Sequence, residues 1–182
     1  MRREGEPIRI MLGVNVSTLK GYTDVPYPYA SISCTRAFEW TLQKIVRSNT
    51  SAFKLLFLYV HVPDEDSFDD MDCIYASPED FKSMMSRDRV TGLHLLQYFV
   101  TRCHEIGVSC VSWIKTGDPK KVICHEVKRI QPDFLVLGNR GLGLFQRIFI
   151  RTVSDFCVKH AECPVITIRR RADEIPEDPA DD

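Results

Sequence analysis

The chain has 182 residues, of which 44% are hydrophobic and 27% charged, a composition typical of one globular domain. No apolar run reaches the ~18 residues that a membrane-spanning helix needs, and the first residues lack the apolar stretch of a secretory signal. Seven irregularly spaced cysteines favour free thiols in a reducing compartment. The expected location is therefore the cytoplasm, with the nucleus as an alternative.

The formal charge of −1 hides an uneven distribution of charged residues. Eight acidic residues and no Lys or Arg lie between Pro63 and Asp80, and six more acidic residues follow Arg171. Without these fourteen, 11 acidic and 24 basic residues remain, a charge of about +13. A basic body suits an anionic partner, either a phosphate-bearing ligand or a nucleic acid. The same distribution of charge is equally typical of a solvated surface with two acidic loops and no anionic partner.

Short β-rich runs alternate with helical periods along the chain. The expected elements, in chain order, are a strand at 8–16, a long loop at 17–32, a helix at 33–48, a strand at 53–62, an acidic loop, a helix from about 77 to 106, a strand at 108–114, a helix at 118–130, a strand at 133–137, a helix at 152–161 and a strand at 164–168. This order predicts a single α/β domain with an open five-stranded parallel sheet and helices on both faces, a Rossmann-like fold.

The helical periods also predict which side chains are buried. The residues expected to face the core are Phe38, Leu42, Ile45 and Val46 in one helix, Leu93, Leu96, Phe99 and Val100 in the next, and Ile123, Val127 and Ile130 in the third. Asp118 and Pro119 are typical of a helix start, because the aspartate can cap the first turn and proline fits there. Ser77 followed by Pro78 indicates another such start.

The segment Gly138-Asn139-Arg140-Gly141-Leu142-Gly143 follows the fourth expected strand. In open parallel sheets, ligands bind beyond the carboxyl ends of the strands. Glycines there let the backbone take a positive φ and approach a ligand, and exposed amides can form an anion-binding concavity. The spacing matches neither a P-loop nor a dinucleotide-binding fingerprint. A plain strand-to-helix turn is the alternative interpretation.

The stretch from Gly138 to Ile168, GNRGLGLFQRIFIRTVSDFCVKHAECPVITI, resembles the nucleotide-binding end of universal stress proteins. The resemblance extends from Ile8 to Ile168, and the long first loop and acidic loop make the plant type the most similar. It implies an adenine nucleotide alpha hydrolase-like fold over residues 8–170. Residues 1–7 would be an N-terminal extension and residues 171–182 an acidic disordered tail.

Family membership would also imply a function. Members of this kind are stress-responsive regulators that bind ATP or AMP, here with or without Mg²⁺, and are not enzymes. They commonly form a homodimer through the last strand. The alternative is a dimeric interaction protein of the same family that does not bind nucleotide. Such a protein would bind a protein partner through the acidic loop.

ATP-binding members carry the pattern G-x2-G-x9-G-[ST], which this chain keeps in part. Gly138 and Gly141 match, Thr152 supplies the hydroxyl, and Arg151 stands at the third glycine. The resemblance also assigns Asn15 to the position of an aspartate that meets the adenosine end of the ligand, and Val62 to a position whose backbone meets adenine. The implied ATP site comprises Asn15, Val62, Gly138, Arg140, Gly141, Gly143, Arg151, Thr152 and Ser154.

The two departures from the pattern weaken the predicted site to different degrees. Asn15 keeps a carbonyl acceptor but loses the carboxylate charge, which costs about 0.5–1.5 kcal/mol if one hydrogen bond is affected. Arg151 would cost on the order of 1–2 kcal/mol of strain if the position requires a positive φ. Alternatively, its guanidinium could contact phosphate oxygens, as could those of Arg140 and Arg147.

Other kinds of site find little support in the sequence. The five histidines are scattered, and His160-x-x-Cys163 is an isolated pair that predicts no metal site. The absence of a C-x-x-C pattern argues against a dithiol redox role. We find no nucleophile elbow and no set of residues typical of a catalytic triad. Nucleic-acid binding would depend on the basic body alone, without an aromatic–basic platform or a helix-turn-helix pattern.

Overall fold

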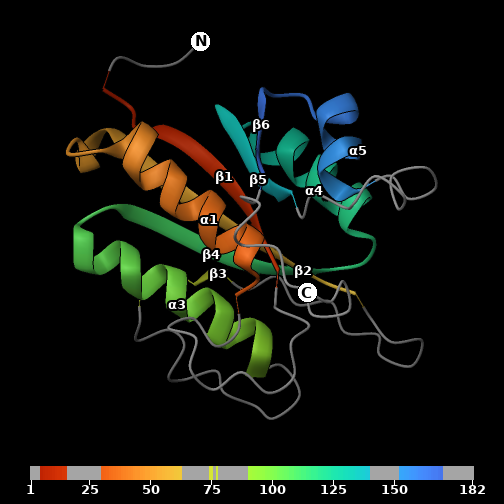
Figure 1. Cartoon of the computed structure of the whole chain (residues 1–182), viewed down its shortest axis with the longest axis horizontal. Coiled ribbons are helices and arrows are strands. Elements are labelled where there is room, and N and C mark those ends of the chain that lie inside the picture. Colours follow the sequence, from red (N-terminus) through yellow and green to blue (C-terminus); the bar gives the residue numbers. More distant parts are fainter. Residues whose placement is uncertain are drawn as a thin grey trace.

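The computed structural model describes residues 5–15, 30–62, 74–75, 77, 90–139 and 152–169, and a twisted sheet runs through its centre (Figure 1). The strands are β1 (Ile8–Val14), β2 (Phe53–His61), β3 (Ile74–Tyr75), β4 (Ser109–Thr116), β5 (Phe134–Asn139) and β6 (Val165–Arg169). The α-helices are α1 (Ile32–Trp40), α3 (Val90–Ile106), α4 (Pro119–Ile130) and α5 (Val153–His160). Along the sheet the strand order is β3-β4-β2-β1-β5-β6.

The predicted open parallel sheet is confirmed, since β4, β2, β1, β5 and β6 all pair in parallel. Two local features differ from the expectation. The acidic segment, expected to be a loop, contributes the short strand β3, which pairs antiparallel with the outer side of β4. The first expected helix consists of α1 followed directly by a π-helix, η1 (Thr41–Val46), and a short 3₁₀-helix, η2 (Thr50–Ala52), precedes β2.

The long helix expected from about residue 77 is described only as α3, because residues 78–89 lie outside the described part of the chain. Its predicted inward residues are all buried, as Leu93, Leu96, Phe99 and Val100 are at most 2% exposed. The start of α4 is also as predicted. The Asp118 side chain caps it by accepting a hydrogen bond from the Lys120 amide at 3.0 Å, and Pro119 occupies the first turn.

Alternate residues of each central strand face opposite helix layers, as the two-residue period of a strand requires. In β1, Ile10 and Leu12 face the layer formed by α1 and α3, whereas Met11 faces α4 and α5. The two layers lie on opposite sides of the sheet in Figure 1. The central strands are therefore buried on both faces. None of the described helices is long and apolar enough to cross a membrane.

The order of the strands defines where a ligand can enter the sheet. From β1 the chain moves outward through β2 to β4, and it then returns to the other side of β1 at β5. The connections on the two sides of β1 thus leave in opposite directions. In open α/β sheets such a switch point forms a crevice beyond the carboxyl ends of the two strands. The carboxyl ends of β1 and β5 therefore mark the expected position of a ligand site.

Candidate functional site at the carboxyl ends of the strands

Three residues of the predicted ATP site lie at the carboxyl ends of neighbouring strands. Asn15 directly follows β1, Gly138 is near the end of β5, and Val62 directly follows β2. Because β2, β1 and β5 are adjacent and parallel, their ends lie along one edge of the sheet. The Val62 side chain is 59% exposed, which is high for a large apolar residue. The fold therefore brings these predicted positions to the switch point.

Asn15 is tied to the start of α1 through Ser31. The Ser31 hydroxyl donates to Asn15 Oδ1 at 2.7 Å, and the Ser31 amide donates to the Asn15 carbonyl at 3.0 Å. Ser31 is fully buried and is also the N-cap of α1, since its Oγ accepts from the Cys34 amide at 3.3 Å. The Asn15 side chain is thus held by the same hydroxyl that starts the helix.

Ser31 was not among the predicted site residues, because it lies in the segment 17–32 that was expected to be a long loop. A serine directly before the helical period was the available signal, because serine is a preferred N-cap residue. The Cys34 thiol also belongs to this junction, since Sγ donates to the carbonyl oxygens of Asn15 and Ser31 at 3.3 Å each. Burial raises the pKa of Cys34, so this cysteine serves as a neutral hydrogen-bond donor.

Gly138 lacks the backbone conformation that the sequence analysis considered for the glycines of this segment. It does not take a positive φ; the described glycines that do are Gly5, Gly107 and Gly117. Instead, a Cβ atom at position 138 would overlap the backbone carbonyl of Ser33 in the first turn of α1. The glycine is required because α1 packs directly against the end of β5. Close helix–strand packing, and not an unusual backbone conformation, accounts for this residue.

Thr152 and Ser154 form the start of α5. Thr152 is the N-cap, and its Oγ1 accepts from the Asp155 amide at 3.1 Å. The hydroxyls of Thr152 and Ser154 are 3.0 Å apart and share a hydrogen bond, with Ser154 only 4% exposed. Because a helix that connects two parallel strands begins at the carboxyl edge of the sheet, these hydroxyls lie at that edge, at the positive end of α5.

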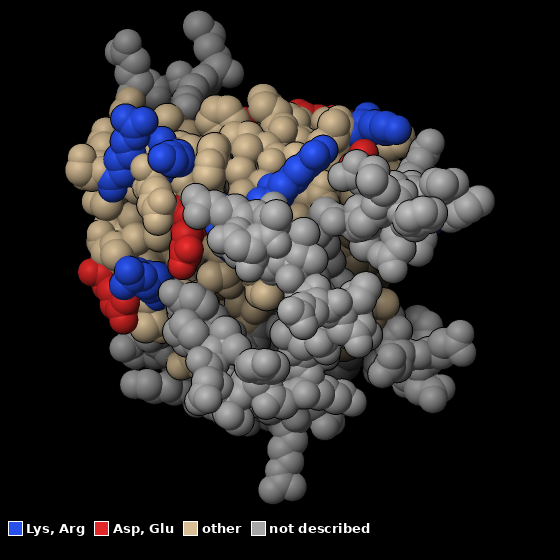
Figure 2. All heavy atoms as spheres, viewed as in Figure 1, with Lys and Arg blue, Asp and Glu red and all other residues tan. Residues whose placement is uncertain are grey.

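The remaining predicted residues, Arg140, Gly141, Gly143 and Arg151, lie outside the described part of the chain. Among the described residues, no group of three or more His, Cys, Asp or Glu side chains could hold a metal ion. On the face shown in Figure 2, the Lys and Arg side chains of the described residues form separate groups, with uncharged and acidic residues between them.

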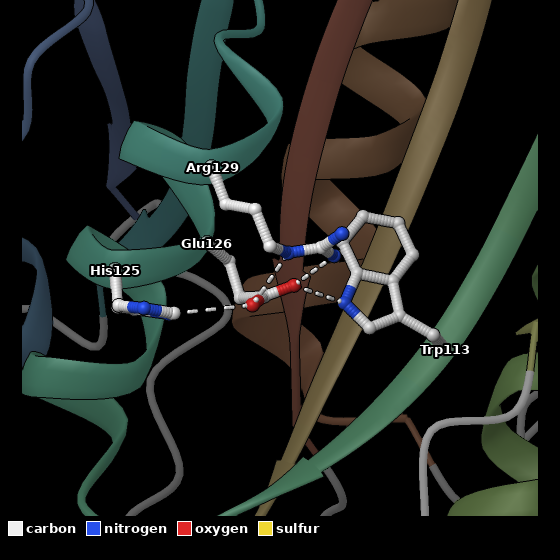
Figure 3. A network of polar contacts seen from close by, with 4 residues as sticks. All are labelled: Trp113, His125, Glu126 and Arg129. Atoms are coloured by element: carbon white, nitrogen blue, oxygen red, sulfur yellow. Dashed lines mark hydrogen bonds and ion pairs between the residues drawn. The ribbon is translucent and has the colours of Figure 1, made fainter.

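A second polar cluster lies away from this edge, between α4 and β4 (Figure 3). The carboxylate of Glu126 is 1% exposed. It accepts hydrogen bonds from Trp113 Nε1 at 2.8 Å and from Arg129 Nε and Nη2 at 3.1 and 2.6 Å, and His125 Nδ1 lies 3.5 Å from it. Glu126 was not among the predicted residues, although it shares the helical spacing of the predicted core residues Ile123 and Ile130.

The charge of Glu126 is maintained in spite of its burial. Burial by itself raises the pKa of this carboxyl, but the hydrogen bonds from Arg129 and Trp113 and the charges of Arg129 and Lys115 outweigh it, so the pKa is lowered. The same contact raises the pKa of Arg129. The ion pair between Glu126 and the half-exposed Arg129 lies within α4. The hydrogen bond from Trp113 to the same carboxylate joins α4 to β4 and makes this contact depend on the ionisation of Glu126.

Comparison with known proteins identifies the family. The sequence model of the universal stress protein family matches residues 21–169. Over 177 residues the chain is 67% identical to the universal stress protein A-like protein of Arabidopsis thaliana, covering 97% of this chain and 98% of that relative. The chain belongs to the universal stress protein family. The resemblance seen in the sequence is thus confirmed.

Solved structures agree with this membership. A crystal structure of an Arabidopsis universal stress protein family protein with AMP bound has a TM-score of 0.71 and 60% identity, and covers 97% of this chain and 100% of that chain. UspA from Lactobacillus plantarum has a TM-score of 0.55 at 20% identity, with 90% and 99% coverage. The Arabidopsis structure is similar to this chain in both fold and sequence, whereas the Lactobacillus structure is similar in fold alone.

Proposed function

We propose that this universal stress protein is a stress-responsive regulator that binds ATP or AMP at the carboxyl edge between β1 and β5, without catalysing a reaction. The observation that carries the proposal is the AMP-bound Arabidopsis structure, which is 60% identical over almost the whole chain. At 14% identity, a universal stress protein crystallised with cAMP supports only the fold. The bound species would be the nucleotide, with or without Mg²⁺.

The replacement of aspartate by Asn15 is compatible with such a site. Asn15 Oδ1 accepts the Ser31 hydroxyl, a contact that an amide oxygen and a carboxylate oxygen can both make. The local structure at the end of β1 therefore does not depend on the charge. The substitution removes a negative charge near the adenosine end of the ligand. One altered hydrogen bond there changes the free energy of binding by about 0.5–1.5 kcal/mol.

At the other side of the proposed site, the hydroxyls of Thr152 and Ser154 can serve a phosphate. When Ser154 donates to Thr152 Oγ1, the Thr152 proton becomes available to a ligand oxygen, while Oγ1 still caps α5. The positive end of the helix favours an anion at the same place. The exposed Val62 would lie under the adenine.

Isothermal titration calorimetry with ATP and AMP, each with and without Mg²⁺, tests the proposal on the full chain. We expect saturable binding to one site per chain and a rise in melting temperature, because a ligand at 100 times its Kd adds about 2.7 kcal/mol. No heat and no thermal shift at millimolar nucleotide would contradict the proposal. That outcome would favour the alternative, a nucleotide-independent interaction protein.

Two substitutions separate the departures from the family pattern. Asn15→Asp restores the carboxylate and should tighten binding about 2- to 12-fold, the equivalent of 0.5–1.5 kcal/mol. Asn49→Asp makes the same chemical change at an exposed residue before η2 and should leave affinity unchanged. Arg151→Gly restores the third glycine; weaker binding in this variant would show that the guanidinium contacts the phosphates, and tighter binding that it obstructs them.

We further propose that the chain forms a homodimer through β6. This strand is an edge of the described sheet, and its residues Val165 to Ile168 are half-buried and mostly apolar. An apolar edge strand can pair with a second copy and continue the sheet. Light scattering should show a dimer, and Thr167→Glu should dissociate it, because like charges meet at the centre of a symmetric strand pair. Ser51→Glu, at an exposed position in η2, is the matched control.

A further inference from the structure

The start of α1 contacts the ends of both strands that flank the proposed nucleotide site. Ser31, the N-cap of α1, is hydrogen-bonded to Asn15 at the end of β1. Two residues later, the Ser33 backbone lies directly against Gly138 near the end of β5. In Figure 1, α1 lies on the same side of the sheet as α3. The first turn of this helix therefore connects the two sides of the switch point.

The hydrogen bonds of the Ser31 hydroxyl determine its orientation. The Cys34 amide supplies its own proton to Ser31 Oγ at 3.3 Å, so the hydroxyl is the acceptor in that contact. Its single proton then goes to Asn15 Oδ1 at 2.7 Å, because a carbonyl oxygen can only accept. The amide group of Asn15 is thereby held with its oxygen toward α1 and its nitrogen on the other side of the planar group.

The backbone of Asn15 is held at the same junction. Its carbonyl oxygen accepts from the Ser31 amide at 3.0 Å and from the Cys34 thiol at 3.3 Å. Ser31 is fully buried and Cys34 is 2% exposed, so water does not compete for these contacts. Together with the side-chain contact, they fix both the position and the rotation of Asn15. A group that is already oriented loses less entropy when a ligand binds to it.

We propose that Ser31 is a positioning residue of the nucleotide site, whose hydroxyl sets the orientation of the Asn15 side chain toward the adenosine end of the ligand. This inference rests on the proposed function, since it concerns the affinity of the same site. Ser31 is fully buried and would not touch the nucleotide itself. It would act through the Asn15 side chain, so its contribution to affinity should disappear when that side chain is removed.

The Ser31 hydroxyl also caps α1, and one substitution separates capping from positioning. Ser31→Gly removes the hydroxyl that binds Asn15, but glycine is itself an acceptable N-cap residue, so α1 should keep most of its stability. Asp118→Gly makes the equivalent change at the N-cap of α4, where the side chain accepts from the Lys120 amide. It is the matched control for the loss of a capping side chain.

Isothermal titration calorimetry with AMP and with ATP on the full chain measures the effect. Ser31→Gly should raise the Kd about 2- to 12-fold, the range for one hydrogen bond, whereas Asp118→Gly should leave it unchanged. In an Asn15→Ala background, Ser31→Gly should change the Kd by less than about 2-fold, because the two residues then no longer interact. A merely structural effect on α1 would weaken binding equally in both backgrounds.

A second measurement uses the unsubstituted chain, so it does not depend on how a variant folds. If the Ser31 contact strengthens nucleotide binding, the nucleotide must by linkage strengthen the Ser31 contact to the same degree. Saturating AMP should therefore slow hydrogen exchange about 2- to 12-fold at the Cys34 amide, which donates to Ser31 Oγ. The Lys120 amide, which donates to Asp118 at the start of α4, should exchange as before.

The outcomes distinguish this inference from the proposed function. If the unsubstituted chain binds neither AMP nor ATP, the proposed function is wrong and this inference is wrong with it. If the unsubstituted chain binds nucleotide and Ser31→Gly has the same Kd, or loses as much affinity in the Asn15→Ala background as without it, this inference alone is overturned. Equal slowing of exchange at the starts of α1 and α4 would also overturn it, because the effect of the nucleotide would then be global.

Discussion

The two faces of the sheet bury their side chains in different ways. Beneath α1 and α3, the rings of Phe38, Phe57 and Phe99 form a cluster with centroids 5.1–5.6 Å apart. Beneath α4 and α5, the core is smaller and includes Glu126, the only charged side chain that is buried among the described residues. Packing of aromatic rings is therefore characteristic of the first face, whereas the second also contains a buried charge whose ionisation depends on pH.

The largest expected effect lies on the first face. Phe99→Ala removes the ring that contacts both other members of the aromatic cluster, and such truncations cost about 3–5 kcal/mol of unfolding free energy. Urea denaturation should show this loss, because the contacts that the ring makes are apolar. Phe99→Leu retains most of the volume and is the control. A loss below 1 kcal/mol for the alanine variant would show that the cluster is not the main source of stability.

The next effect concerns the contact between α1 and β5. Gly138→Ala places a methyl group against the Ser33 backbone, which cannot rotate away as a side chain could, so we expect a loss near the upper end of the 1–3 kcal/mol typical of overpacking. Hydrogen exchange should accelerate in α1. In Gly107→Ala the methyl group has open space but requires a positive φ, so α1 should keep its protection. Unchanged α1 exchange in Gly138→Ala would contradict the packing role.

On the second face, Glu126→Gln should cost about 1.5–3 kcal/mol at pH 7, the range for hydrogen bonds to charged groups. The folded-state pKa of Glu126 is lowered, so its stabilisation is complete above the unfolded pKa of about 4.3 and is lost as the pH falls through the folded value. Denaturation of both proteins from pH 7 to pH 3 should show the curves converging. A difference that stays constant with pH would mean that the charge has no part in it.

The regular part of this fold was predictable because local physics determines it. The period of the apolar residues sets the helices and strands, and Asp118 caps α4 as its residue type predicts. The position of Asn15 and Gly138 beside the switch point also follows from strand order. What the sequence did not reveal depends on contacts across the fold.

Gly138 illustrates this difference. Its presence at a strand end was read as backbone freedom for a ligand, but its neighbour is Ser33, more than a hundred residues away. The hydrogen bond from the Ser31 hydroxyl to Asn15 likewise appears only when the start of α1 lies beside the end of β1. Glu126 had a local signal in its helical spacing, yet a glutamate at a core position becomes credible only once Trp113 and Arg129 are known to meet it.

The smallest expected effect links the second face to the proposed nucleotide site. Thr152→Ala removes the N-cap of α5 and the partner of Ser154, which should cost about 1 kcal/mol of stability. Thr152→Ser keeps the hydroxyl and should restore it. If the start of α5 also contacts a phosphate, calorimetry will show weaker ATP binding for the alanine variant and normal binding for the serine variant. Equal affinity in all three proteins would confine Thr152 to capping, because a hydroxyl that donates to the ligand cannot be lost without effect.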